Sequence, residues 1–223
     1  MPILESGTIK IHSIPHDDDS PPESYDLFSN GNLYSAGTSI SRKQIGFCSL
    51  FDVLEKEVID SLRSQYRIKT IGPIIPSMYL DKRLKDDKEY ALSFFKPNSE
   101  TCMKWLDSRE TGSVVYVSFG SLASLGEQQM EELASGLMTS NCYFLWVVRA
   151  TEQDKLTEEF MSKSKEKGLI VNWCPQLDVL SHRAVGCFFT HCGWNSTLEA
   201  LSLGVPMVTM PQWSDQPTNA KFI

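Results

Sequence analysis

The chain lacks the features of a membrane-spanning or secreted protein. No apolar run approaches about 18 residues, the length that a membrane-spanning helix needs. The opening residues, MPILESGTIK, contain neither a basic start nor an apolar core, so no signal peptide is expected. Six cysteines form no C-x-x-C pair, and several fall in apolar segments, so we expect reduced, buried thiols. These absences predict a cytoplasmic globular protein.

Positive charge is also scarce. The sequence has 21 Lys and Arg against 28 Asp and Glu, a formal net charge of −7. Such a chain is a poor partner for nucleic acid or an anionic membrane surface. A G-x-G-x-x-G loop after a strand is missing, since the candidate loop reads SFGSLASLG, which speaks against a dinucleotide-dependent oxidoreductase. The acidic run 17–19 beside His16 lies in a Pro/Ser-rich stretch, which favours a solvated loop over a metal site.

What the chain has is a regular alternation of buried apolar runs and amphipathic helices. Glu127 to Met138 carries an apolar helical stripe, and Pro175 and the pair Asn195-Ser196 suit the starts of two further helices. The alternation predicts an α/β fold with a parallel sheet and right-handed crossovers. The strands are expected near 114–118, 143–148, 168–172, 186–190 and 206–210.

Polar side chains follow the last three of these strands, at the edge where open α/β sheets bind ligands. Trp173 offers a flat ring for a base, and the helix near Asn195 offers backbone N–H groups for a diphosphate. Glu199 lies one helical turn further on, where a carboxylate can accept hydrogen bonds from ribose hydroxyls. Asp215 and Gln216 can reach the far end of the same ligand. The pattern is that of a nucleotide-sugar site.

The stretch that carries this pattern, WCPQLDVLSHRAVGCFFTHCGWNSTLEALSLGVPMVTMPQWSDQ, resembles a known signature. It is similar, end to end, to the signature box of the plant family 1 UDP-glycosyltransferases of secondary metabolism. About ten non-apolar identities at fixed spacing make the resemblance specific. It implies a GT-B fold, of which this chain would hold the Rossmann-like parallel sheet of the C-terminal, donor-binding domain with a remnant of the N-terminal domain.

The resemblance also implies a role for each polar member of the box. By position, Trp173 stacks on the uracil, Gln176 contacts the ribose region and Glu199 binds the ribose hydroxyls. A glutamine at the last position resembles members that use glucose. The other implied contacts are His191, Asn195 and Ser196 to the diphosphate, the Trp194 backbone beside the sugar, Asp215 and Gln216 to the sugar hydroxyls, and Gly120 and Ser121 to the diphosphate from an upstream loop.

The chain also departs from the family pattern. A complete member is roughly twice as long. We expect an incomplete N-terminal acceptor domain over 1–70, loosely packed over 7–45, an inter-domain linker and helix over 71–110, and a truncated donor-binding domain over 111–223. The loop that carries the family's catalytic base histidine has no counterpart, which leaves His16 as a weak substitute candidate and His12 as a second.

Two functions therefore remain open. One is a UDP-sugar-dependent transferase that moves glucose to a small phenolic or carboxylic acceptor, with inversion and without a metal. The other is a truncated, non-catalytic chain that binds the donor or a partner. In both cases the resemblance implies no cofactor other than the UDP-sugar co-substrate.

Overall fold

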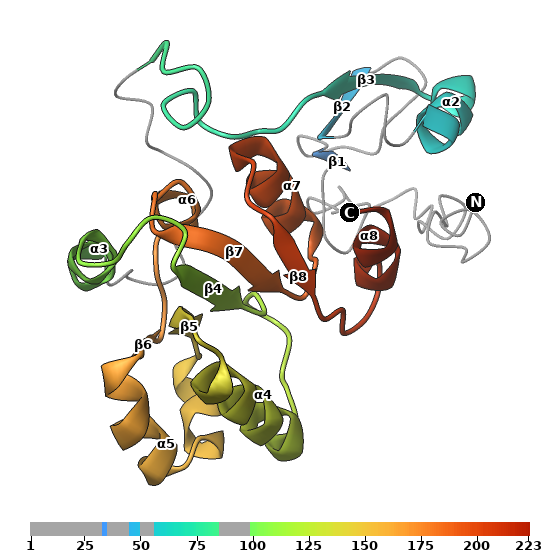
Figure 1. The fold of residues 1–223 in the computed structure, drawn as a ribbon. Coiled ribbons are helices and arrows are strands. Elements are labelled where there is room, and N and C mark those ends of the chain that lie inside the picture. Colours follow the sequence, from blue (N-terminus) through green and yellow to red (C-terminus); the bar gives the residue numbers. More distant parts are fainter. Residues whose placement is uncertain (1–32, 35–44, 50–55, 85–98) are drawn as a thin grey trace. The chain divides into compact units, whose positions relative to one another are not determined.

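A computed structural model describes residues 33–34, 45–49, 56–84 and 99–223 (Figure 1). It divides into two compact units, Met1–Ile74 and Ile75–Ile223. The boundary falls inside the segment expected to link two domains. His12 and His16 lie outside the described residues, as does nearly all of the stretch 7–45 that we expected to be loosely packed.

The first unit contains a small three-stranded sheet in the order β1-β2-β3. Strand β2 pairs in parallel with β3 and antiparallel with β1. Helix α2 connects β2 to β3 and buries Ile59 and Leu62. The elements are β1 (Leu33–Tyr34), β2 (Ile45–Ser49), α2 (Lys56–Gln65) and β3 (Arg67–Ile71).

The second unit is built on a five-stranded sheet in the order β6-β5-β4-β7-β8. Every neighbouring pair is parallel. The chain runs from central β4 outward to β5 and β6, then crosses back to β7 and β8 on the other side. The two directions separate between β4 and β7, which makes this the switch point where open sheets bind ligands. The strands are β4 (Val114–Ser118), β5 (Tyr143–Val147), β6 (Gly168–Val171), β7 (Val185–Thr190) and β8 (Met207–Thr209).

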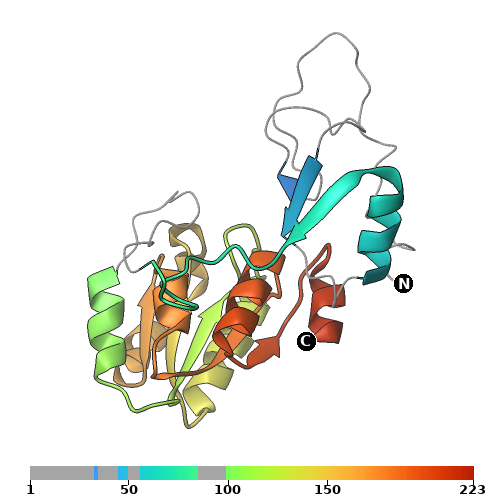
Figure 2. The ribbon, with the colours of Figure 1, turned by 90° about the horizontal axis from the view of Figure 1, so that it is seen from above.

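Helices cover both faces of this sheet (Figures 1 and 2). Helices α3, α6 and α7 pack on one face, and α4 and α5 pack on the other, each over its own apolar cluster. Short 3-10 helices at 150–155 and 164–166 join β5 to β6, and α8 follows β8. The helices are α3 (Ser99–Asp107), α4 (Glu127–Thr139), α5 (Glu158–Lys163), α6 (Gln176–Leu180), α7 (Trp194–Leu203) and α8 (Gln216–Phe222).

The central strand feeds both layers because its side chains alternate across the sheet. Val114 and Tyr116 join the cluster under α6 and α7, whereas Val117 joins the cluster under α4. The Tyr116 ring stacks on Phe188 of β7, with ring centroids 4.8 Å apart. Burial of one such aromatic side chain stabilises a fold by about 1.5–3 kcal/mol, so this pair helps to fix β4 against β7.

The predicted α/β class and the five parallel strands are confirmed, with strand bounds within one or two residues. Two helix starts were wrong. We expected Asn195 and Ser196 to cap α7, but Gly193 is the cap residue and makes no side-chain cap bond. The left-handed backbone of Cys192, at φ 63°, turns the chain early enough for the helix to begin at Trp194. Likewise Pro175 precedes α6 as its cap residue and is not its first residue.

The expectation of buried thiols holds for part of the set. Cys102, Cys174 and Cys192 are buried free thiols, and burial raises their pKa values to about 11, 12 and 11. They are therefore protonated at neutral pH. Cys142, by contrast, is exposed, and Cys187 is half-buried. Among the described residues, no helix is both long and apolar enough to cross a membrane.

Candidate functional site

The predicted polar residues lie along the carboxyl edge of the five-stranded sheet. Trp173 and Gln176 follow β6, and His191 follows β7 at the switch point. Three residues separate β7 from α7, and the first turn of α7 carries Trp194 and Asn195. This edge is built from segments that are far apart in the sequence but end at the same level of the sheet, because all five strands run in parallel.

A hydrogen-bond network joins α6, α7 and the central strand. The Gln176 amide donates to Ser196 Oγ at 3.0 Å and to Glu199 Oε2 at 2.7 Å. In turn, the Tyr116 hydroxyl donates to Gln176 Oε1 at 3.0 Å. It also lies 3.3 Å from Cys174 Sγ. Three residues of the predicted set are thus joined by hydrogen bonds, and Tyr116, which also contacts Cys174, binds them from the core.

Glu199 is the buried acid of this network, with 5% of its surface exposed. A buried carboxylate is costly unless hydrogen bonds compensate for lost hydration. The Gln176 amide supplies one such bond, and both of its hydrogens are used within the protein. An ionised carboxylate accepts hydrogen bonds at two oxygens, so Glu199 is chemically suited to receive ligand hydroxyls at this edge of the sheet.

The His191 side chain lies close to two glycines, Gly120 in the loop after β4 and Gly193 in its own loop. A side chain at either position would clash with the imidazole. A Cβ at Gly120 would come within 2.7 Å of His191 Nε2, and one at Gly193 within 2.5 Å. Gly120 also has φ +72°, a conformation that other residues adopt at a cost. The loop after β4 can therefore approach the imidazole closely only because these positions lack side chains.

The electrostatics of His191 favour the neutral imidazole. Burial lowers its pKa below the usual value, while the negative charge of Asp215 and a hydrogen bond with the Ser118 backbone act in the opposite direction. Burial prevails, so the ring is uncharged at neutral pH. An anion placed beside the ring would oppose the burial effect and raise the pKa.

The first turn of α7 offers backbone donors beside this loop. The helix has ten residues, and its cap residue, Gly193, makes no side-chain cap bond. Such a helix end carries a partial positive charge. Asn195 is exposed there, and Trp194 is half-buried. Trp173 is half-buried at the end of β6, on the same edge of the sheet.

The last two predicted residues, Asp215 and Gln216, hold the segment that follows β8. Asp215 Oδ2 accepts a hydrogen bond from Asn219 Nδ2 at 2.8 Å, and the same amide donates to the Cys192 carbonyl at 2.9 Å. This amide ties α8 to the His191 loop. Gln216 is 2% exposed, and its Oε1 accepts from the backbone N–H groups of Gln212 and Trp213. Its carbonyl oxygen therefore holds a turn within the protein.

Ser121 is exposed in the loop after β4, and Arg149 anchors that loop. The Arg149 guanidinium donates to the Ser121 carbonyl at 2.6 Å and to the Ala123 carbonyl at 2.5 Å. Hydrogen bonds from a charged donor are stronger than neutral ones. The loop that approaches His191 is thus fastened from the end of β5, an attachment that the sequence did not suggest.

Sequence reasoning also missed Tyr116. A usable signal was present, because alternation along VVYVS places Tyr116 and Ser118 on one face of β4, with Ser118 next to the predicted site. A buried tyrosine hydroxyl needs a hydrogen-bond partner, so this side chain was bound to meet polar groups. Burial, together with the nearby thiol of Cys174, raises the Tyr116 pKa.

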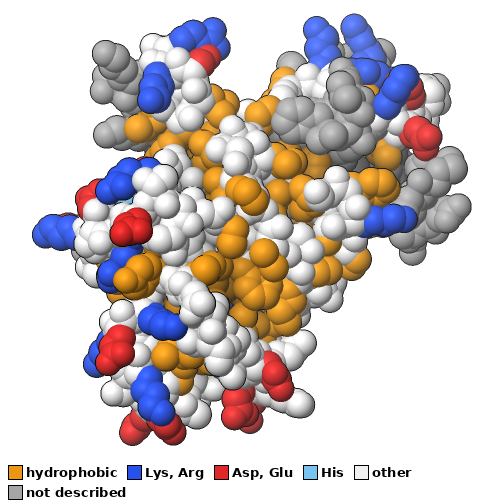
Figure 3. All heavy atoms as spheres, in the orientation of Figure 1, with side chains coloured by type: hydrophobic (Ala, Val, Ile, Leu, Met, Phe, Trp, Pro, Cys, Tyr) orange, Lys and Arg blue, Asp and Glu red, His pale blue; other side chains and the backbone are white. Residues whose placement is uncertain are grey.

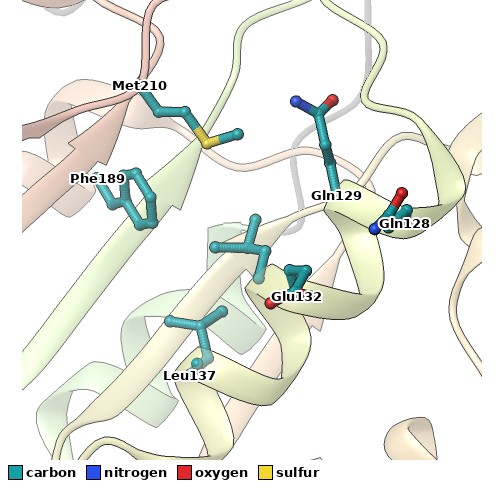
Figure 4. A pocket seen from close by; sticks show the side chains of 8 residues that line it. Gln128, Gln129, Glu132, Leu137, Phe189 and Met210 are labelled. Carbon is teal, nitrogen blue, oxygen red and sulfur yellow. The ribbon is translucent and has the colours of Figure 1, made fainter.

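The structure also contains an apolar pocket of about 500 Å³ on the face of the sheet that α4 covers, opposite the face that α6 and α7 cover (Figure 4). It lies between α4 and the ends of β7 and β8, and it contains none of the predicted site residues. Figure 3 shows hydrophobic side chains gathered near the middle of the face seen in Figure 1. The pocket is lined by Gln128, Gln129, Glu132, Leu133, Gly136, Leu137, Phe189 and Met210.

Fold and site together define an open parallel α/β unit with polar groups converging at its switch point. The family model described as "UDP-glucoronosyl and UDP-glucosyl transferase" matches residues 45–223. The chain belongs to this family of UDP-dependent glycosyltransferases. The plant relatives and the GT-B structures below confirm the resemblance and the fold that the signature box implied.

Individual relatives agree with this assignment. Mogroside I-E synthase of Siraitia grosvenorii is 52% identical over 98% of this chain and 50% of its own length. UDP-glycosyltransferase 74E2 of Arabidopsis thaliana is 57% identical over 83% of this chain and 41% of its own. The crystal structure of Os79 from O. sativa in complex with UDP superposes with a TM-score of 0.74 and 47% identity, over 79% of this chain and 39% of that one. The chain thus spans about half the length of these curated relatives.

Proposed function

We propose that the second unit binds a UDP-sugar and that the chain serves the transfer of glucose from UDP-glucose to a small phenolic or carboxylic acceptor. The observation that carries the proposal is the network in which Gln176 joins Ser196 and the buried carboxylate of Glu199 at the switch point. Solved relatives support it, since Os79 is described as a complex with UDP and a Phytolacca americana relative as a complex with UDP-2fluoro-glucose and pterostilbene.

The proposed ligand runs along the carboxyl edge of the sheet. The uracil stacks on Trp173, and the ribose hydroxyls donate to Glu199 beside Gln176. The diphosphate meets the first turn of α7 at Asn195 and Ser196, where backbone N–H groups and the helix dipole favour an anion. His191 and the 120–121 loop close the other side of the diphosphate.

The sugar would extend from the diphosphate toward Asp215 and Gln216, past the Trp194 backbone. In this structure Asp215 and the Gln216 carbonyl already hold the turn before α8. In the proposal, the sugar hydroxyls would meet these two side chains. This segment would therefore place the sugar as well as support the His191 loop.

The proposed reaction is a single displacement with inversion at the sugar C1. The acceptor oxygen forms a bond to C1 while the bond from C1 to the β-phosphate oxygen breaks. UDP leaves with that electron pair, and the acceptor proton passes to a base. Backbone donors and the helix end at the diphosphate would stabilise the charge that develops on UDP, a role that the proposal assigns to protein groups without a metal.

A second function is favoured by the distribution of histidines. Of the four in the chain, His191 lies at the proposed diphosphate site and His182 pairs with Asp107 at 3.2 Å. His12 and His16 fall outside the family's base loop. If no group replaces that base, the chain binds the donor without transferring sugar at an enzymatic rate, because general-base assistance contributes about 10²–10⁴-fold.

One assay separates the two functions. The purified chain is incubated with UDP-glucose and a panel of phenols and carboxylic acids, and glucoside and UDP are quantified together. Turnover of about one per second or faster establishes the transferase. UDP binding by calorimetry without glucoside establishes the donor-binding chain. Absence of both refutes the proposed function.

A further inference from the structure

Tyr116 contacts the network of the predicted site, but the proposed function gives it no role. It lies in the central strand with 1% of its surface exposed, and its ring stacks on Phe188. The ring belongs to the core, but the hydroxyl reaches the carboxyl edge and donates to Gln176 Oε1 at 3.0 Å. Among the described side chains, it connects the interior of the sheet directly to the predicted site.

We propose that Tyr116 is a positioning residue, whose hydroxyl holds the Gln176 amide so that the amide holds the Glu199 carboxylate in the orientation that receives the ribose. This inference rests on the proposed function, because it assumes that a nucleotide ribose meets Glu199. It assigns Tyr116 no contact with the nucleotide.

The geometry pins the Gln176 amide at both ends. Its NH₂ group donates to Ser196 and Glu199, and its carbonyl receives the Tyr116 hydrogen. The NH₂ end of the amide faces the carboxyl group, with Gln176 Nε2 2.7 Å from Glu199 Oε2. Tyr116 then supplies the matching donor at the carbonyl end.

Without the tyrosine hydroxyl, the amide would keep only one end fixed. Gln176 is half-buried and is the first residue of the five-residue helix α6, so only a short helix fixes its backbone. Its side chain has several rotatable bonds and would regain freedom. A carboxylate that loses its fixed donor also loses a preferred orientation, and a precise bond geometry is what hydrogen-bonded recognition of hydroxyls needs.

The side chains around the phenol favour donation toward Gln176. Cys174 Sγ lies 3.3 Å from the hydroxyl oxygen, and either atom of this pair can be the donor. A thiol can donate to the phenol oxygen. The single hydrogen of Tyr116 is then left for the carbonyl of Gln176, which has none of its own.

The test compares two nucleotides on one variant. Tyr116→Phe keeps the ring and its stacking on Phe188 and removes one hydroxyl. Calorimetry with UDP should show a Kd raised about tenfold, which corresponds to about 1.4 kcal/mol. With 2′,3′-dideoxy-UDP, which lacks the ribose hydroxyls, the Kd should change by less than about twofold. Tyr143→Phe, which removes a hydroxyl at the opposite end of the sheet, serves as the matched control.

A general structural defect gives a different result from a positioning defect. Equal weakening of UDP and 2′,3′-dideoxy-UDP in Tyr116→Phe overturns the inference while leaving the proposed function intact. In a Gln176→Ala background, Tyr116→Phe should cause no further loss of UDP affinity, and an additive loss contradicts the route through Gln176. If the unaltered chain does not bind UDP, the proposed function fails and the inference fails with it.

A second measurement requires neither ligand nor variant. In ¹⁵N-labelled unaltered protein, the side-chain amide hydrogens of Gln176 should exchange with solvent about tenfold or more slowly than those of Gln65, an exposed residue at the end of α2. Tenfold is the scale of a bond worth about 1.4 kcal/mol. Equal exchange rates would show that the amide is not held, and would overturn the inference even where Tyr116→Phe does not fold.

Discussion

The replacement Gly120→Ala should be far more damaging than a single methyl group suggests. Two costs combine at this position. The first is the backbone, because φ is +72° and a residue with a Cβ pays about 1–2 kcal/mol in the left-handed region. The second is steric, because the new Cβ would lie 2.7 Å from His191 Nε2 and 2.8 Å from its Cε1.

The chain offers a control that separates these costs. Gly112 has φ +71°, but a Cβ built there meets nothing within 4 Å. Gly112→Ala therefore carries the backbone cost alone, about 1–2 kcal/mol. Gly120→Ala adds overpacking against a half-buried ring, typically about 1–3 kcal/mol. The two variants should differ by that second amount in the free energy of unfolding.

Urea unfolding monitored by circular dichroism measures both variants on the same scale. His191→Ala removes the ring that the new methyl group meets, so Gly120→Ala should cost less in that background than in the unaltered chain. Equal destabilisation by Gly112→Ala and Gly120→Ala, or full additivity of Gly120→Ala with His191→Ala, would refute the close approach of the loop to the imidazole.

Three further predictions concern the site and its loop. Glu199→Ala should weaken UDP binding by about 1–3 kcal/mol, the scale for losing hydrogen bonds to a charged group, and Trp173→Ala by a similar amount through lost stacking; unchanged calorimetric affinities in both variants would contradict the assignment, with Glu131→Ala on the exposed side of α4 as the control. Burial holds the pKa of His191 below its usual value, so its contribution to stability is present above about pH 6.5 and declines as the pH falls further. The loss of unfolding free energy between about pH 7.5 and about pH 5.5 should therefore be smaller in His191→Gln than in the unaltered chain, and an equal loss would be the contrary result. Arg149→Ala should destabilise the chain by about 1.5–3 kcal/mol or more by removing the charged donors to the Ser121 and Ala123 carbonyls, and hydrogen exchange should be faster over 119–125; an unaltered exchange pattern there would show that Arg149 does not anchor the loop.

The parallel sheet was predictable because its signals are local. Apolar runs and helical stripes such as that of Met130 and Leu133 follow from the periodicity of side chains. The placement of Glu199 and Ser196 on one face of a single helix was within reach too, and both side chains accept a hydrogen bond from Gln176. The helix starts were less certain, because Cys192 adopts a left-handed backbone that its residue type does not favour.

The rest of the site depends on contacts between distant segments. Tyr116 and Gln176 are separated by 60 positions, and Arg149 reaches Ser121 across 28. Neither pair shows a spacing that sequence could reveal, because register between parallel strands decides which side chains meet. The crowding of His191 by Gly120 has the same origin. A glycine in SFGS indicates a turn, but not what lies next to it.

Mapping UDP onto the protein by NMR tests the central claim most directly. Backbone amide shifts are recorded for the ¹⁵N-labelled chain as UDP is added. We expect the largest changes in the segments 119–121, 173–176 and 191–199, which form the carboxyl edge of the sheet around the switch point. Changes concentrated instead around the pocket of Leu133, Phe189 and Met210, or no changes at saturating UDP, would contradict the account.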